Sequence, residues 1–415
     1  MLLSGRIPHC LKGSYIRNGP VRVTRSGQTP HFFDGDGMLH KVSFRDGSVL
    51  FSKEFVQTSK FIEESSLDEH LYNGIFTPRL KNTHKIKAIN VSNTNVLHMN
   101  GKLFSLYEAA PPYEVKMKNL QTVGESNLDG ILEHTQPLAA HYRYHESNLV
   151  TFSVVQDGFN SVVHIYEVCP KTSTLIKHFK FTLKHCGFPF FHDILVTDNY
   201  YLLVENPTRL NVQRMVSGFH SRECSLAECI DHVDSRPMKL HIVNRADGTK
   251  NCVTLGKGFV FHHACAWESS SEIYWRSCVY PTMTFKGSDT LKTQNAFLTQ
   301  FSLNLHTMQT TSRRLVEYPC EFPVNCSKEH SLFIGSVKDG LYNCIAKINH
   351  LTGEHCQYFP DAVPHEPVVT DDGYIMFFVG EQELHIVDSE LRHVAVVQTP
   401  FPIPLGLHGI WVGSS

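Results

Sequence analysis

Short strand-like segments follow one another along almost the whole chain, and this pattern limits the fold more than any other feature. Segments such as 148–156 and 372–388 are rich in β-branched and aromatic residues, and Gly, Asn, Asp or Pro separates them from their neighbours. Segment 94–108 reads as two strands joined at Asn100-Gly101, a pair that favours a tight hairpin turn. The chain is therefore predicted to be all-β.

The length of the chain narrows the architecture. At 415 residues the chain is too long for one sandwich, and segment 225–233 is the one candidate for a short helix. Blades of four strands take about 40–50 residues each, so a propeller of about six to eight blades would use the whole length. No Pro- or Ser-rich linker interrupts the sequence, and residues 1–415 are expected to form a single domain.

Charge and hydropathy argue against two kinds of partner. The formal net charge is −2 and no block of Lys and Arg stands out, so no nucleic-acid partner is expected. No apolar run reaches the roughly 18 residues of a membrane-spanning helix. The first residues show neither a signal-peptide core nor a recognisable transit sequence. We expect a soluble or peripherally membrane-associated protein of the cytoplasm, or of a plastid in a photosynthetic source, with an oligomeric state that the sequence leaves open.

Histidine is abundant, and four of the 26 histidines stand in apolar, strand-like settings far apart in the sequence. No local motif such as HExxH could bind a metal within one element. In a propeller, however, the innermost strand of each blade lines the axis, so one histidine from each of four blades could meet there. The alternative is that each is an ordinary core or channel histidine. The four are His141 in PLAAHYRY, His192 in FPFFHDIL, His262 in FVFHHACAWE and His408 in PLGLHGIWV.

Two short motifs carry paired polar residues whose roles must be considered one by one. In segment 259–268, His262 and His263 are neighbours on one strand, so their side chains point to opposite faces and only one can face the axis. In FFDGDGM, Asp34 and Asp36 invite a metal-binding interpretation. The glycines beside them favour a tight turn instead, in which the two carboxylates accept hydrogen bonds from local backbone N–H groups.

Seven motifs, in order from about residue 13 to residue 412, together resemble the carotenoid cleavage oxygenase family. The resemblance implies a seven-bladed β-propeller with a non-haem Fe(II) on its axis and loops that cap the top face. It therefore covers nearly the whole chain. The motifs are GSYIRNGP, HFFDGDGMLHKVSF, NTNVLHMNGKLFSLYEAAPPYEV, FHDILVTDNYYLLVENP, FHHACAWE, EFPVN and PLGLHGIW.

The resemblance also implies the residues of the metal site, position by position. The iron ligands would be the four histidines named above, with His262 rather than His263 as the third. Three glutamates would accept hydrogen bonds from ligand imidazoles, which fixes the tautomer and orients each ring. Near the ligands, three aromatic residues are candidates for the substrate tunnel. The glutamates are Glu108, Glu321 and Glu366, and the aromatic residues are Phe191, Phe261 and Trp267.

The reaction implied is the cleavage of a conjugated C=C bond of a carotenoid or apocarotenoid, with O2 and Fe(2+), to give two carbonyl products. One alternative is a dioxygenase of stilbene-type phenylpropanoids. Another is a catalytically degenerate propeller that binds carotenoids. Because polyenes are insoluble, segment 207–219 is a candidate for peripheral contact with a membrane. One departure from the family is Cys265, which stands where members usually have Asn.

Overall fold

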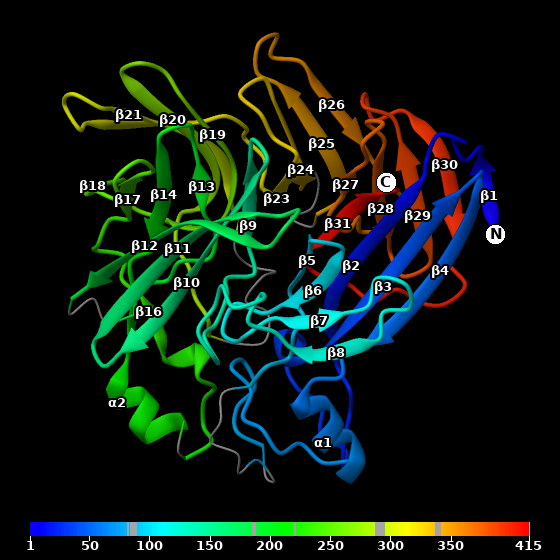
Figure 1. Cartoon of the computed structure of the whole chain (residues 1–415), viewed down its shortest axis with the longest axis horizontal. Helices are drawn as coiled ribbons and strands as arrows, with labels where there is room; N and C mark the ends of the chain where they lie inside the picture. The colour runs from blue at the N-terminus through cyan, green and yellow to red at the C-terminus, as the bar shows by residue number, and fades with distance from the viewer. Residues whose placement is uncertain are drawn as a thin grey trace.

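The computed structural model of the chain describes residues 1–80, 83, 89–184, 188–219, 221–286, 295–336 and 342–414. Seven antiparallel sheets are arranged around a central axis, so the predicted seven-bladed β-propeller is confirmed (Figure 1). Within each sheet the strands lie side by side, from an innermost strand at the axis to an outermost strand at the rim. The described part of the chain contains no helix that is long and apolar enough to cross a membrane.

Each of the first six blades has four strands, which follow one another from the axis outward. From the axis, the first blade contains β31 (Gly409–Gly413), β2 (Gly13–Val21), β3 (Asp36–Arg45) and β4 (Ser48–Phe55). The second contains β5 (Asn95–Met99), β6 (Lys102–Leu106), β7 (Tyr113–Val115) and β8 (Thr122–Glu125). The third contains β9 (Tyr142–His145), β10 (Asn148–Asp157), β11 (Asn160–Cys169) and β12 (Thr174–Leu183).

The next three blades repeat this order. The fourth blade contains β13 (Leu195–Val196), β14 (Tyr200–Glu205), β17 (Lys239–Asn244) and β18 (Lys250–Thr254). The fifth contains β19 (Phe259–Glu268), β20 (Glu272–Tyr280), β21 (Phe297–Asn304) and β22 (Thr310–Arg314). The sixth contains β23 (Cys320–Val324), β24 (His330–Gly335), β25 (Cys344–Asn349) and β26 (His355–Tyr358).

Both ends of the chain close the ring. The seventh blade contains β27 (Val368–Val369), β28 (Ile375–Val379), β29 (Glu383–Val387) and β30 (His393–Gln398), and β1 (Leu2–Gly5) adds a fifth strand at its outer edge. The last strand, β31, pairs with β2 and becomes the innermost strand of the first blade. Two ends that pair with distant strands leave the ring without an open seam.

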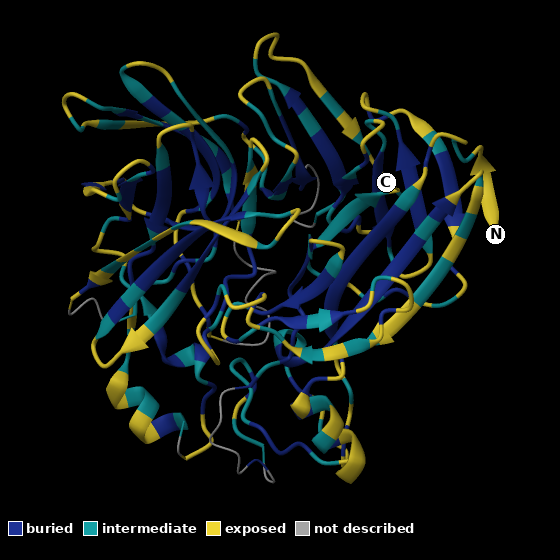
Figure 2. Cartoon of the chain, in the orientation of Figure 1, coloured by how far each residue is buried: buried dark blue, intermediate teal, exposed yellow. Residues whose placement is uncertain are grey.

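Apolar side chains between neighbouring blades form the core. Leu202, Leu240 and Trp275, for example, are completely buried where the fourth blade packs on the fifth. Dark blue strand centres run through every blade in Figure 2, whereas the outer strands and turns are exposed. The predicted hairpin is also present, because β5 and β6 are joined by Asn100 and Gly101, both with positive φ.

Helices are few and lie in the connections between strands. They are α1 (Ser59–Leu67), α2 (Val212–Arg214), the 3-10 turns Phe32–Asp34 and Ala227–Cys229, and the π-helical turn Met215–Phe219. The short helix expected over 225–233 is limited to Ala227–Cys229, because the backbone becomes extended at Ile230 and enters β16 (Ile230–His232), which pairs with β15 (Thr208–Leu210).

Segment 207–219 contains β15, α2 and the π-helical turn. Both α1 and α2 lie at the same end of the molecule (bottom of Figure 1). Val212 and Val216 are exposed on the α2 segment. Contact of this segment with a membrane stays a prediction.

Asp34 and Asp36 have structural partners, but these are far along the chain. The buried Asp34 carboxylate accepts hydrogen bonds from the backbone N–H groups of Ile75 (2.8 Å), Phe76 (2.9 Å) and Thr77 (2.6 Å). Asp36 instead forms buried ion pairs, at 3.0 Å with Arg25 and 2.7 Å with Lys60. The expectation that both carboxylates bind local backbone is therefore wrong, since they tie their turn to α1 and to the segment that follows it.

Candidate metal centre

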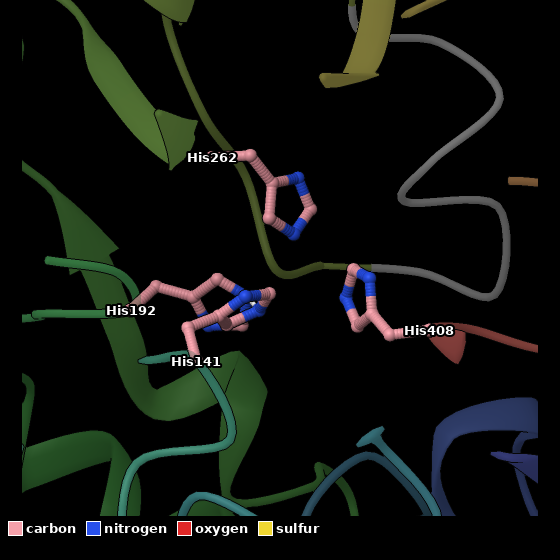
Figure 3. A group of neighbouring side chains, drawn as sticks. All are labelled: His141, His192, His262 and His408. Atoms are coloured by element: carbon pink, nitrogen blue, oxygen red, sulfur yellow. Dashed lines mark hydrogen bonds between the residues drawn. The ribbon is translucent and has the colours of Figure 1, made fainter. Parts of the chain in front are cut away.

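Four blades each bring one histidine to the axis. His141 directly precedes β9, His192 lies shortly before β13, His262 lies within β19, and His408 directly precedes β31. The imidazoles point toward one another (Figure 3). One nitrogen of each ring lies within 4.8 Å of a nitrogen of every other. Opposite nitrogens on one ion lie about 4.2 Å apart when metal–imidazole bonds are about 2.1 Å, so this spread suits a single metal ion.

The other three blades supply carboxylates behind the histidines. In three of the four histidines, Nδ1 donates a hydrogen bond to a glutamate carboxylate. Each of the three predicted glutamates contacts a different ring. Glu108 follows β6 of the second blade, Glu321 lies in β23 of the sixth, and Glu366 precedes β27 of the seventh. The pairs are His192 with Glu108 (2.7 Å), His262 with Glu321 (2.6 Å) and His408 with Glu366 (2.8 Å).

These contacts prepare the inner nitrogens to bind a metal. When Nδ1–H donates a hydrogen bond to a carboxylate, Nε2 carries no proton, and its free lone pair faces the axis. The Nε2 atom of His262 is buried and has no hydrogen-bond partner among the described residues. The Nε2 atoms of His141 and His192 lie 3.0 Å apart. A buried lone pair without a donor fits a metal ligand, and neutral imidazoles suit mid-series divalent ions.

Electrostatics keep two of the rings neutral. Burial, followed by the nearby imidazoles, lowers the pKa of His141 and His262 well below the ordinary value. At His192, burial is the largest influence and lowers the pKa, but the carboxylates of Glu108, Asp193 and Glu321 together offset it, so the pKa is raised. Burial raises the pKa of Glu321 to about 7. Neutral imidazoles give the carboxylates no fixed positive charge nearby. A divalent ion at the axis would supply that charge.

Local irregularities in two neighbouring strands aim the side chains. The pairing of β19 with β20 shifts register between Val260 and His263, and the pairing of β23 with β24 shifts between Glu321 and Val324. Such bulges bend a strand and re-aim its side chains. Phe322, next to Glu321, has φ of 54°, and its ring lies tilted against that of His262 with the ring centroids 5.2 Å apart. A bulky residue in this backbone conformation is uncommon, and here it sits against the histidine cluster.

His263 points away from the axis. Its Nδ1 lies 2.7 Å from the hydroxyl of Ser277 on β20, and its backbone N–H donates to Asp193 at 2.9 Å. Burial lowers the pKa of His263 to about 4, so the ring is neutral. The structure therefore places the two neighbouring histidines on opposite sides, with His262 alone in the cluster.

An ion pair that the sequence motifs did not indicate joins the inner strands of three blades. Arg143 on β9 pairs with the buried Asp193, and also donates to the His263 carbonyl at 2.7 Å. Asp193 directly follows His192, so this pair fixes the backbone beside two of the four histidines. An Asp after a candidate ligand and an Arg two residues after another were the available signals in the sequence.

A cavity of about 510 Å³ opens onto the cluster. Phe191 and Phe261 line it, as expected, whereas Trp267 does not and instead stacks on Tyr274 at 5.5 Å. The volume falls in the range of small-molecule sites. The lining is mostly aromatic and aliphatic, and most of it comes from connections between strands. Members from these connections include Ile75, Phe76, Tyr107, Phe188, Phe190, Met283 and Phe285, and Phe322 of β23 also lines the cavity.

Comparison with known proteins decides the family. The family described as retinal pigment epithelial membrane protein matches residues 1–413. The chain belongs to this family, that of the carotenoid cleavage oxygenases. The family and the enzyme class expected from the sequence motifs are thereby confirmed.

Individual members are similar over most of their length. Apocarotenoid-15,15'-oxygenase of Synechocystis sp. is 27% identical, and the match covers 99% of this chain and 92% of that protein. Carotenoid 9,10(9',10')-cleavage dioxygenase of Crocus sativus is 25% identical, with 98% and 85% covered. The crystal structure of cobalt-substituted Synechocystis ACO superposes with a TM-score of 0.89 at 26% identity, and covers 99% of this chain and 94% of that one.

Cys265, the predicted departure from the family motif, makes polar contacts within the fold. Its thiol donates to the carbonyl of Ser327 at 3.3 Å, and Arg276 donates to the same carbonyl at 2.9 Å. Burial raises the pKa of Cys265 to about 12, so the thiol stays protonated. Cys265 thus connects the fifth blade to the loop before β24 in the sixth blade.

Glu321 offers a test of the outer carboxylates. In Glu321→Gln the amide oxygen still accepts from Nδ1 of His262, but the buried negative charge is lost. We expect the affinity for Fe(II) to fall by about 10–100-fold, as removal of such partners does elsewhere. Anaerobic metal titration measures it. Glu317→Gln, at a side chain that is 87% exposed, is the matched control and should bind iron as the wild type does. Unchanged affinity in Glu321→Gln would contradict the role assigned to this carboxylate.

Proposed function

We propose that the protein is an Fe(II)-dependent dioxygenase that cleaves one conjugated C=C bond of an apocarotenoid or carotenoid to give two carbonyl products. The observation that carries this proposal is the convergence of four imidazoles at the wall of an apolar, aromatic cavity. His141, His192, His262 and His408 would hold the iron, with the three glutamates behind them. When bound, iron supplies the activation of O2 that the protein side chains cannot supply.

The residues of this chain contribute position and exclusion of water. Aromatic side chains such as Phe190, Phe261 and Phe285 offer flat apolar surfaces along which a polyene can lie. Tyr107, Tyr280 and Tyr342 bring phenolic hydroxyls to the wall, beside the polar side chains of Asn93, Thr94 and Gln156. Burial is the largest cause that raises the pKa of each tyrosine. They remain protonated, so the cavity has no charged side chain besides the cluster and its carboxylates among its described lining residues.

Product analysis tests the proposal directly. Purified protein is loaded anaerobically with Fe(II) and then mixed with isotopically labelled O2 and, separately, an apocarotenal, a carotenoid and resveratrol. We expect aldehyde or ketone products that carry the label from an apocarotenoid or carotenoid. Products from resveratrol alone would favour the phenylpropanoid alternative. Tight binding of a carotenoid without any product would favour the degenerate carotenoid-binding propeller instead.

A further inference from the structure

A second cavity lies between the fourth blade and the outermost strand of the third. Its volume is about 640 Å³, and it shares no described lining residue with the cavity at the metal centre. The ring of Phe181 on β12 packs against two of the cavity's lining residues, 5.8 Å from the ring of His241 and 4.5 Å from the ammonium of Lys250. The metal chemistry has no use for this cavity.

Strand register places a glutamate, a histidine and a cysteine together in its wall. His241 on β17 pairs directly with Cys252 on β18, and on its other side with Leu203 of β14, two residues before Glu205. Residues opposite each other, or two apart on a neighbouring strand, share one face of a sheet. Glu205, His241 and Cys252 therefore form one row across three strands, and all three line the cavity.

The row has the order of a nucleophile, a base and an orienting carboxylate. Glu205 holds Nε2 of His241 at 2.6 Å. Nδ1 is buried and has no aligned hydrogen-bond donor among the described residues, and His241 is 2% exposed. Cys252, directly opposite His241 on β18, is a free, exposed cysteine. A thiol next to an imidazole that a carboxylate orients is the arrangement that activates cysteine nucleophiles.

The charge states follow from these contacts. The interaction with His241 is the largest cause that lowers the pKa of Cys252 below its ordinary value. Burial is the largest influence on His241 and lowers its pKa, but Cys252 and Glu205 together raise it. Both shifts favour the thiolate–imidazolium pair over the neutral thiol and imidazole, and the thiolate is the reactive form of a cysteine.

The rest of the wall selects for anions. Four cationic side chains line the cavity, and Glu205 is the single carboxylate among the described lining residues. One of the four, Lys239, pairs with Glu205 at 3.2 Å. The surplus of positive charge would raise the local concentration of anionic reagents near the thiol. The cations are Lys184, Arg236, Lys239 and Lys250.

We propose that Cys252 is a reactive thiol that exchanges with anionic disulfides, at a site that His241, Glu205 and the surrounding cations form. In the exchange, the Cys252 thiolate attacks one sulfur of the disulfide, the S–S bond breaks, and the other half leaves as a thiolate. Cys252 is oxidised to a mixed disulfide and the leaving half is reduced, so no further oxidant is needed. This site is independent of the metal centre and of the activity proposed there.

Thiol kinetics locate the reaction. The whole protein reacts with excess dithiobis(nitrobenzoate), a dianionic disulfide, at neutral pH, and mass spectrometry of peptides identifies the modified residue. We expect Cys252 to react at least about fivefold faster than Cys10, the matched exposed cysteine. Cys252→Ser should remove the fast phase and Cys10→Ser should leave it. A fast phase that persists in Cys252→Ser would overturn the proposal.

Two further comparisons separate the parts of the site. Lys250→Gln should slow the reaction of Cys252 with the dianion by about threefold, more at low salt, and should slow the reaction with neutral dithiodipyridine by a smaller factor. Lys171→Gln, on an exposed turn, is the control. His241→Gln should move the apparent pKa of the reaction up toward about 8.5. If that variant does not fold, the pH profile of Cys252 in the wild type decides, because an ordinary thiol pKa there would overturn the proposal.

Discussion

Replacing His262 by alanine should abolish both iron binding and activity, whereas replacing its neighbour His263 should leave both nearly intact. His262 offers a buried Nε2 to the axis, so its loss removes one of four ligand nitrogens and leaves Glu321 with no imidazole to hold. We expect the loss in iron affinity to exceed the roughly 10–100-fold typical of an outer partner. Metal analysis after anaerobic loading, together with product formation, measures both effects.

His263→Ala is the matched control, one residue away on the same strand. Its ring contacts Ser277 and lies outside the cluster. The variant leaves the Ser277 hydroxyl without that partner and opens a small void, which should lower the free energy of unfolding by about 1–3 kcal/mol. Chemical denaturation of the apoprotein gives that value. A His263→Ala protein that binds no iron, beside a His262→Ala protein that does, would reverse the assigned register of β19.

The sequence predicted the parts of the site that repeat a family motif and missed those that depend on contacts between distant segments. Alternation along a strand required that His262 and His263 face opposite ways, but the bulge in β19 that accompanies this arrangement leaves no sign in the strand pattern. Trp267 was placed in the tunnel because of its nearness in sequence. Trp267 lies five residues after His262, and five residues along a strand span about 17 Å, so its side chain lies far from the histidine cluster.

The same limit applies to groups whose partners lie on other strands or on distant segments. The pair of Arg143 with Asp193 and the row that ends in Cys252 both depend on which strands become neighbours, and single-sequence patterns do not fix that pairing. Asp34 shows the consequence most clearly. A turn rich in Gly and Asp suggested local hydrogen bonds, yet its carboxylate binds residues 75–77, because the folded ring brings that segment alongside.

Asp34→Ala should destabilise the protein more than any other change at an acidic turn residue. The carboxylate accepts from three successive backbone N–H groups and from the Thr77 hydroxyl at 2.6 Å, and Asp34 is 2% exposed. Hydrogen bonds to a buried charged group are worth about 1.5–3 kcal/mol each and are not additive, so we expect a loss of about 3–5 kcal/mol in unfolding free energy. Denaturant titration measures the loss, with the exposed Asp157→Ala as control.

The hydrogen bonds from residues 75–77 to Asp34 also shape the proposed substrate cavity. The loss of activity should therefore exceed the loss of folded protein. Ile75 and Phe76, which Asp34 holds, line the cavity wall. Gly74→Ala provides an independent route to the same change, because a Cβ there would lie 2.3 Å from the Asp34 carboxylate. Both variants should keep the four-histidine site and bind iron, yet turn over substrate with a raised KM. If Asp34→Ala matched the wild type in stability and KM, the segment after α1 would be held by other contacts and the carboxylate would be dispensable.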